Sequence, residues 1–99
     1  MRIGKILSAE DFPNAKKPAY KLTIDFGYEI GIKKSSAQIT KLYSKEDLIG
    51  KLIVAIVNFP LKQIADFISE VLVLGTSNEN GEVALIVPEK ESAIGSRIS

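Results

Sequence analysis

The chain contains no cysteine and no histidine among its 99 residues. Without cysteine it has no disulfide framework, no thiolate metal site and no cysteine nucleophile. Without histidine it lacks the usual general base near neutral pH and the commonest metal ligand of proteins. Among the candidate functions, these two absences favour a binding protein over an enzyme.

Long apolar runs are also missing. The most apolar stretch, residues 52–74, is interrupted by Asn58, Pro60, Lys62, Asp66 and Glu70. It therefore lacks the roughly 18 uninterrupted apolar residues that mark a membrane-spanning helix. The amino end alternates like a strand and shows no signal peptide pattern. We expect a cytoplasmic protein without membrane insertion.

The composition, 45% apolar and 25% charged, is that of a globular protein, and one domain over residues 1–99 is expected. The net charge of +1 hides an uneven distribution of charge. Residues 16–62 contain nine lysines and four acidic residues, a net charge of +5, whereas residues 63–99 have a net charge of −4. A basic face attracts phosphate backbones, and a solvated coat of lysines is the alternative explanation.

Residues 20–33 give the clearest local pattern. Apolar side chains alternate before Gly27 and again after it: Tyr20, Leu22, Ile24, Phe26, then Tyr28, Ile30, Ile32. The pattern predicts an antiparallel hairpin with one buried face. A first strand over residues 2–9 precedes it, with Gly4 at a bulge or a close backbone approach. Residues 10–20 contain two prolines and predict a loop.

The second half of the chain predicts a short helix over residues 44–50, capped by Ser44 and ended by Gly50. A strand buried on both faces (52–59), another strand (69–75) and a tight turn at Asn80 and Gly81 follow. This order predicts an all-β OB-fold, a five-stranded barrel with a short helix between strands 3 and 4 and an added C-terminal hairpin arm. A split sandwich is the alternative.

Residues 57–75 read as two strands with a functional segment between them. Asn58 closes the first strand, Pro60 prevents its continuation, and Ser69 opens the second. Residues 60–68 would then cross one end of the barrel. This crossing would place Lys62, Ile64 and Phe67 near a ligand surface.

The candidate reactive groups have simpler explanations. Ser35 and Ser36 follow Lys33 and Lys34, but neighbours on a strand point to opposite faces, so a serine–lysine nucleophile is not expected. The serine hydroxyls would instead bind backbone or a phosphate, or simply form a polar loop that caps the barrel. The acidic pair at 46–47 suits the start of a helix. We expect no catalytic residue, no metal and no cofactor.

Three phenylalanines lie next to prolines or polar loops: Phe12, Phe59 and Phe67. They would line a groove and either stack on bases or hold apolar peptide side chains. Burial in the core is the alternative for each of them.

Three stretches, "AYKLTIDFGYEIGIKKSSAQIT", "LIGKLIVAIVNFP" and "KQIADFISEVLVLG", resemble the CsaA-type secretion chaperones. These are free-standing members of the tRNA-binding domain family, which also includes the C-terminal appendage of many methionyl-tRNA synthetases. The resemblance covers almost the whole chain. It implies an OB-fold core, a symmetric homodimer and no catalysis.

The resemblance also implies site residues. The predicted RNA-binding residues are Lys33, Lys34, Ser35, Ser36, Asn58, Lys62, Ser69 and Glu70. Of these, Lys34 is added as the second cation of the stretch "IKKSSAQIT", and Lys62 is added because it lies in the segment expected to cross the barrel end. For peptide binding we predict Phe12, Phe59, Ile64 and Phe67, which rest on their surroundings in the sequence and not on a family motif.

Two departures from the family pattern are visible. CsaA-type chains usually carry a short segment before the first strand, which bears on dimer stability, whereas here the strand begins at once. Val71 and Leu72 follow Ser69 and Glu70 where the synthetase type has a Gly-Met pair, which favours the CsaA branch. We therefore predict a homodimeric chaperone for unfolded or export-bound polypeptides, with a tRNA-binding or structured-RNA-binding module as the alternative.

Overall fold

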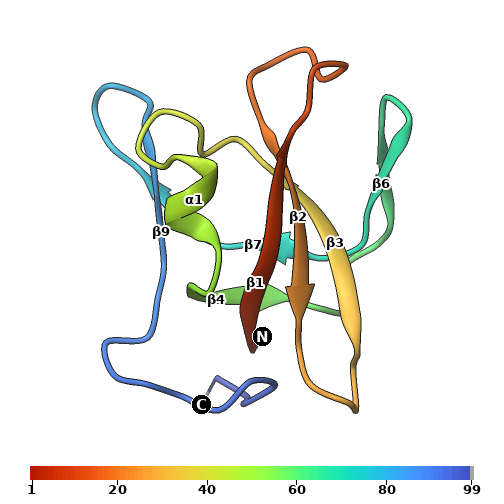
Figure 1. The fold of residues 1–99 in the computed structure, drawn as a ribbon, viewed down its shortest axis with the longest axis vertical. Helices are drawn as coiled ribbons and strands as arrows, with labels where there is room; N and C mark the ends of the chain where they lie inside the picture. The colour runs from red at the N-terminus through yellow and green to blue at the C-terminus, as the bar shows by residue number, and fades with distance from the viewer. Residues whose placement is uncertain (99) are drawn as a thin grey trace.

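A computed structural model describes residues 1–98, and Figure 1 shows a barrel with two small hairpins attached to it. Five antiparallel strands form one sheet in the order β3-β2-β1-β4-β7. Their bounds are Arg2–Asp11 (β1), Tyr20–Asp25 (β2), Ile32–Ala37 (β3), Leu52–Ile56 (β4) and Leu72–Val73 (β7). The predicted five-stranded OB-fold barrel with one short helix is confirmed.

The barrel core follows from the alternation in β2 and the uniform apolar character of β4. Tyr20, Leu22 and Ile24 of β2 are buried and the residues between them are half-buried. Ile53, Val54 and Ala55 of β4 are all buried, as expected for a strand covered on both faces.

Gly4 is the position where β1 meets the sheet most closely. A Cβ atom there would lie 2.6 Å from both Ile24 Cγ2 and Phe26 Cε1, so the predicted close approach is confirmed. The irregularity of the ladder falls later, between Ile6 and Ser8.

The hairpin of residues 20–33 is confirmed, but its second strand lies further along the chain. Gly27 and Gly31 have φ values of 89° and 86°, and together they form a wide turn that brings Asp25 opposite Ile32. Tyr28 and Ile32 are therefore exposed by 101% and 59%, and their predicted burial is wrong. In the observed register Ile32 pairs with Asp25, whereas the buried Leu22 pairs with Ser35, so Ser35 takes the buried position on β3.

The predicted helix is α1, Lys45–Leu48. Ser44 Oγ accepts a hydrogen bond from the Asp47 amide at 3.3 Å, and Asp47 Oδ2 accepts one from the Ser44 amide at 3.3 Å. Leu48 is buried beneath the helix, and Gly50 follows it with a φ of 86°.

The interpretation of residues 57–75 requires correction. Residues 60–68 do not simply cross the barrel end, because Lys62–Ile64 (β5) and Phe67–Ser69 (β6) pair as a hairpin of their own. Ser69 ends β6 and does not open a strand. The single strand predicted over 69–75 is divided because the Glu70 amide turns away to the Lys34 carbonyl at 2.8 Å.

The C-terminal arm consists of β8, Gly75–Ser77, and β9, Val83–Leu85. Gly81 has a φ of 75° in the turn between them, so the predicted hairpin is confirmed. In Figure 1 the β5–β6 hairpin and β9 lie on opposite sides of the barrel, with the β1–β2 loop between them at the top. No helix within residues 1–98 is long and apolar enough to cross a membrane.

Candidate ligand-binding surface

An aromatic pair joins the end of β1 to the β5–β6 hairpin. The rings of Phe12 and Phe67 meet edge to face with their centroids 5.5 Å apart. Lys21 Nζ lies 5.4 Å from the centroid of the Phe12 ring and 5.8 Å from that of Phe67. Lys34 Nζ lies 5.7 Å from the Phe67 centroid. Two cations therefore cover the rings, at distances where cation–π attraction operates.

A basic hollow of about 540 Å³ lies beside this pair, between the β1–β2 loop and the β5–β6 hairpin. Its charged lining consists of Lys16, Lys17 and Lys62, and no carboxylate side chain lines it. Ile64 contributes an apolar side chain to the same hollow. The surface therefore combines positive potential with apolar contact, which suits anionic or mixed acidic–apolar ligands.

Two buried serines and one glutamate close the barrel between β3 and the end of β6. Ser35 is 1% exposed and its hydroxyl donates to the Val71 carbonyl at 2.9 Å. Ser69 is 6% exposed, and its Oγ accepts from the Ser36 amide at 3.2 Å. Glu70 Oε1 accepts from the Lys34 amide at 3.0 Å. Side chains thus replace a regular strand ladder at this point.

These contacts separate the predicted RNA-binding residues into two groups. Ser35 and Ser69 direct their hydroxyls into the barrel wall, which leaves those groups committed to protein partners. Lys34 and Lys62 are exposed, and Ser36 lines the basic hollow. Their contact with RNA stays a prediction.

Three further predicted residues lie elsewhere. Lys33 is half-buried in β3. Asn58 is exposed and lines a different hollow, of about 340 Å³, next to Met1 and Arg97. Phe59 is half-buried in the connection between β4 and β5 and takes no part in the contact between Phe12 and Phe67. The structure therefore does not bring Asn58 into the basic hollow.

Four residues at or beside this surface are absent from the predicted site residues: Lys16, Lys17, Lys21 and Gln38. The first two form an adjacent pair between Pro13 and Pro18, and this doublet in a rigid loop was an available signal. Nothing in the sequence placed Lys21 over two rings, because that contact joins segments 46 residues apart (Lys21 and Phe67).

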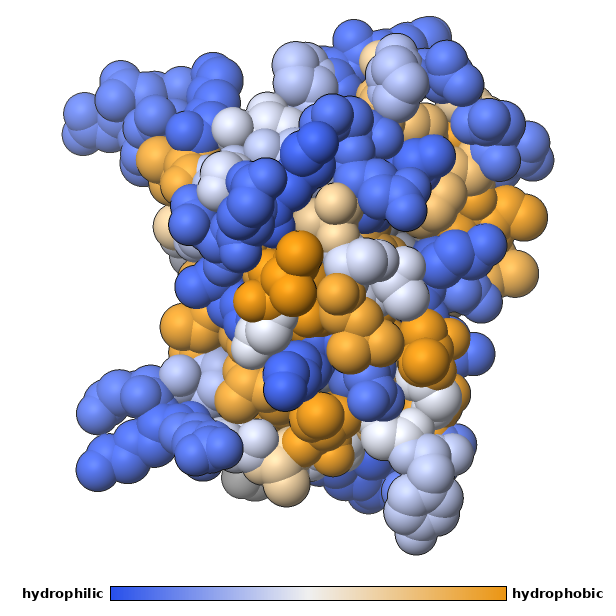
Figure 2. Space-filling model, in the orientation of Figure 1, coloured by the Kyte–Doolittle hydropathy of each residue, from blue (hydrophilic) through white to orange (hydrophobic). Residues whose placement is uncertain are grey.

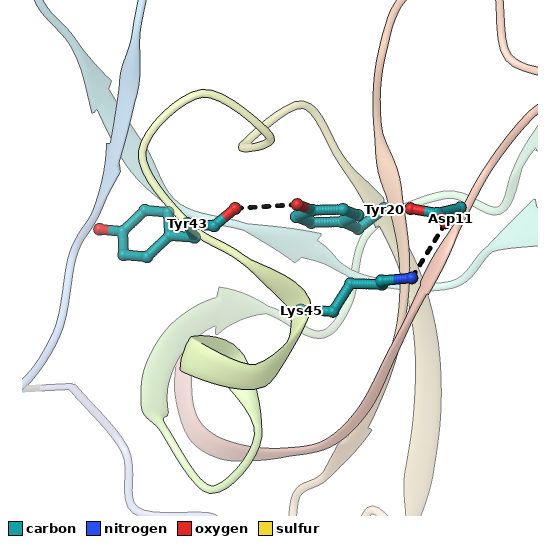
Figure 3. A network of polar contacts seen from close by, with 4 residues as sticks. All are labelled: Asp11, Tyr20, Tyr43 and Lys45. Atoms are coloured by element: carbon teal, nitrogen blue, oxygen red, sulfur yellow. Dashed lines mark hydrogen bonds and ion pairs between the residues drawn. The ribbon is translucent and has the colours of Figure 1, made fainter.

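Polar contacts also hold the side of the barrel that carries α1, and Figure 3 shows two of them, Tyr20 with Tyr43 and Lys45 with Asp11. Tyr20 Oη donates to the Tyr43 carbonyl at 2.8 Å, and Tyr43 Oη accepts from the Leu85 amide at 2.9 Å. Lys45 Nζ lies 2.9 Å from Asp11 Oδ2, and this contact raises the pKa of Lys45 through the hydrogen bond and the carboxylate charge. These contacts connect α1 and the C-terminal arm to the barrel.

Apolar side chains are also visible on the molecular surface. Figure 2 shows hydrophobic patches across the middle of this face, while hydrophilic residues dominate its upper edge, where the loops lie. Exposed aliphatic residues include Leu61 and Ile68, which belong to the β5–β6 hairpin and its approach. Fold and surface together define a small β-barrel that presents a basic and apolar face.

The comparisons with known proteins agree with this class. Residues 1–97 match the family described as "Putative tRNA binding domain", and the chain belongs to this family. Methionine–tRNA ligase of Thermococcus onnurineus is 36% identical over 98 residues, which are 99% of this chain and 13% of that protein. The corresponding ligase of Nanoarchaeum equitans is 37% identical, and its match covers 12% of that protein. The chain thus spans about an eighth of these relatives.

Two solved structures of CsaA chaperones are similar over nearly the whole chain. The protein from Bacillus anthracis is 57% identical with a TM-score of 0.93, and the match covers 99% of this chain and 88% of that one. The protein from Picrophilus torridus is 55% identical with a TM-score of 0.93, and the match covers 99% of this chain and 89% of that one. The predicted resemblance to the CsaA and tRNA-binding family is confirmed.

Proposed function

We propose that this protein is a non-catalytic chaperone that binds unfolded or export-bound polypeptides. The observation that most directly supports this proposal is the apolar surface at the β5–β6 hairpin. There Ile64 lines the basic hollow and Phe67 lies beside it. The 57% identity to a CsaA chaperone supports the same conclusion. Unfolded chains expose apolar segments, and such a surface would shield them from aggregation.

Suppression of aggregation tests this proposal. The wild type is mixed with a chemically unfolded client protein, and light scattering is followed at stoichiometric amounts. Phe67→Asp should suppress scattering less well, since it places a carboxylate in the apolar contact, whereas Phe67→Leu should retain most of the effect. Tyr28→Asp is the matched control, because this aromatic residue is 101% exposed on a distant turn. If the wild type does not suppress light scattering, the proposal is wrong.

The chaperone is proposed to act as a homodimer, as the resemblance implies. Two copies of one binding surface would raise the avidity for a single long client. Val87 and Ile86 are exposed after β9, and such apolar residues are available to a second copy. Sedimentation velocity over a wide concentration range tests the dimer, and a monomer at every concentration would exclude it.

RNA binding, above all of tRNA, is the second candidate. It is favoured by the three lysines of the basic hollow and by the family itself. Phosphate contacts release counterions, so the affinity for tRNA should fall steeply with salt concentration. Lys62→Ala should lower the slope of log affinity against log salt concentration by about one. Lys90→Ala, in the separate hollow beside Lys51, should leave this slope unchanged. An affinity independent of salt would contradict this candidate.

A further inference from the structure

Three hollows of the surface meet at Gln38. The basic hollow of about 540 Å³ includes Gln38 in its lining. A second hollow of about 290 Å³, between the β1–β2 loop and the β8–β9 turn, includes it too. A third, of about 210 Å³, lies between the end of β3 and β7, and we name it the seam. All three have this residue in their lining, and we name the three hollows together the path.

The path changes character along its length. The basic hollow has three lysines, 16, 17 and 62, and no carboxylate. The seam carries no charged side chain, and its apolar lining includes Ala37, Ile39, Leu72, Val73 and Leu85. One end therefore attracts anionic groups and the other excludes water from small aliphatic side chains.

Gln38 stands between these two ends with a free amide. Its side chain is exposed, and it makes no hydrogen bond with any other residue in the described chain, 1–98. A glutamine amide offers both an N–H donor and a C=O acceptor, the same pair of groups that a peptide unit presents. Such a side chain is suited to bind the backbone of an extended polypeptide irrespective of its sequence.

We propose that Gln38 binds the backbone of an extended client segment, which places an acidic side chain in the basic hollow and an aliphatic side chain in the seam. This inference rests on the proposed chaperone function and names its preferred clients: acidic, aliphatic stretches. Charge complementarity with the three lysines selects the acidic residue. Alternation between the two hollows suits an extended chain, whose successive side chains point to opposite sides.

The surface is better suited to a polypeptide than to RNA bases. Stacking needs an open aromatic face, yet Phe12 is only 4% exposed and both rings of the aromatic pair have lysines over them. The seam is lined by aliphatic groups and offers no ring at all.

The charge preference is tested with two peptides. Fluorescein-labelled decapeptides alternate leucine with aspartate in one case and leucine with lysine in the other, with blocked ends. Fluorescence anisotropy at low salt should show the aspartate peptide binding on the order of tenfold more tightly, and Lys16→Ala and Lys62→Ala should each reduce that ratio. Equal affinities for the two peptides would overturn the inference.

The role of Gln38 is tested by a cycle that pairs Gln38→Leu with single N-methylation of the peptide backbone. At one backbone position, methylation should weaken wild-type binding roughly fivefold. Gln38→Leu should weaken binding by a similar factor and then be insensitive to methylation there. Asn80→Ala, an exposed amide on the β8–β9 turn, serves as the control and should behave like the wild type.

The outcomes separate the inference from the proposed function. If no peptide binds and aggregation is not suppressed, the chaperone function itself fails. If peptides bind but Gln38→Leu changes nothing, only the inference is overturned. A single-stranded RNA oligonucleotide that loses affinity on Gln38→Leu, while the peptides do not, would assign the path to RNA and likewise overturn it.

Discussion

Glu70 binds the backbone of Lys34 at two points. Its amide donates to the Lys34 carbonyl at 2.8 Å, and its Oε1 accepts from the Lys34 amide at 3.0 Å. One residue thus supplies both hydrogen bonds that a strand neighbour would supply, one from its backbone and one from its side chain. This contact closes the barrel where β3 and β7 do not pair.

Glu70→Ala should destabilise the barrel by about 1 kcal/mol, because the Lys34 amide loses its acceptor at a partly exposed site. Glu70→Gln keeps a side-chain oxygen and should lose less than half of that. Urea unfolding measures both free energies. Equal losses for the glutamine and alanine variants would show that the charge of Glu70, and not its hydrogen bond, stabilises the barrel.

Ser69→Ala and Ser35→Ala should differ although both remove a buried hydroxyl. Ser69→Ala leaves the Ser36 amide without its acceptor, which should reduce the free energy of unfolding by about 1–3 kcal/mol. After Ser35→Ala, the Val71 carbonyl still accepts from the Ser69 hydroxyl at 3.3 Å, so the loss should be smaller. The same unfolding experiment compares them, and equal losses would contradict this assignment of acceptors.

Ala65 has a φ of 53° in the turn between β5 and β6, a conformation that alanine rarely adopts. Glycine has no such penalty, so Ala65→Gly should stabilise the protein by about 0.5–1 kcal/mol despite its greater entropy when unfolded. Ala93→Gly, at an alanine without a positive φ, is the control and should destabilise by about the same amount. Thermal unfolding of the two variants measures both changes. If both variants are less stable than the wild type, Ala65 is not strained.

Lys45 gives the fold a dependence on pH. Its hydrogen bond to Asp11, followed by the charge of that carboxylate, raises the pKa of Lys45 above its ordinary value of 10.5. The stabilisation is therefore complete below pH 10.5 and is lost as the pH rises through the higher pKa of the folded state.

The difference in Tm between the wild type and Lys45→Met should therefore shrink above pH 10.5 and stay constant between neutral pH and pH 10.5, where Asp11 carries its charge. In an Asp11→Asn background the two should differ little at any pH. A difference that grows with alkalinity would mean that the ion pair does not stabilise the fold.

The barrel could be predicted from sequence because its signals are local. The alternation of β2 and the Ser44 cap each lie within a few residues, and both are found where the sequence indicated them. The β5–β6 hairpin could not be predicted in this way, since its strands are three residues long and depend on the contact of Phe67 with Phe12.

The proposed binding surface was predictable only in part for the same reason. Lys62, Ile64 and Phe67 were expected near a ligand surface, and the structure places all three at the β5–β6 hairpin. Gln38 acquires its position only when the β1–β2 loop, β7 and the C-terminal arm gather around it. No spacing within the sequence encodes such a meeting of distant segments.

The two ends of the described chain lie together. The marks N and C stand close together in Figure 1. The Ile3 amide donates to the Ser96 carbonyl at 2.9 Å, and the Ile98 amide donates to the Met1 carbonyl at 3.1 Å. A short linker would therefore connect them, and new ends opened in the exposed turn at Gly81 would give a circular permutant with the barrel intact. Both ends of the described chain therefore occupy one corner of the barrel, and the hydrogen bonds between them close that corner.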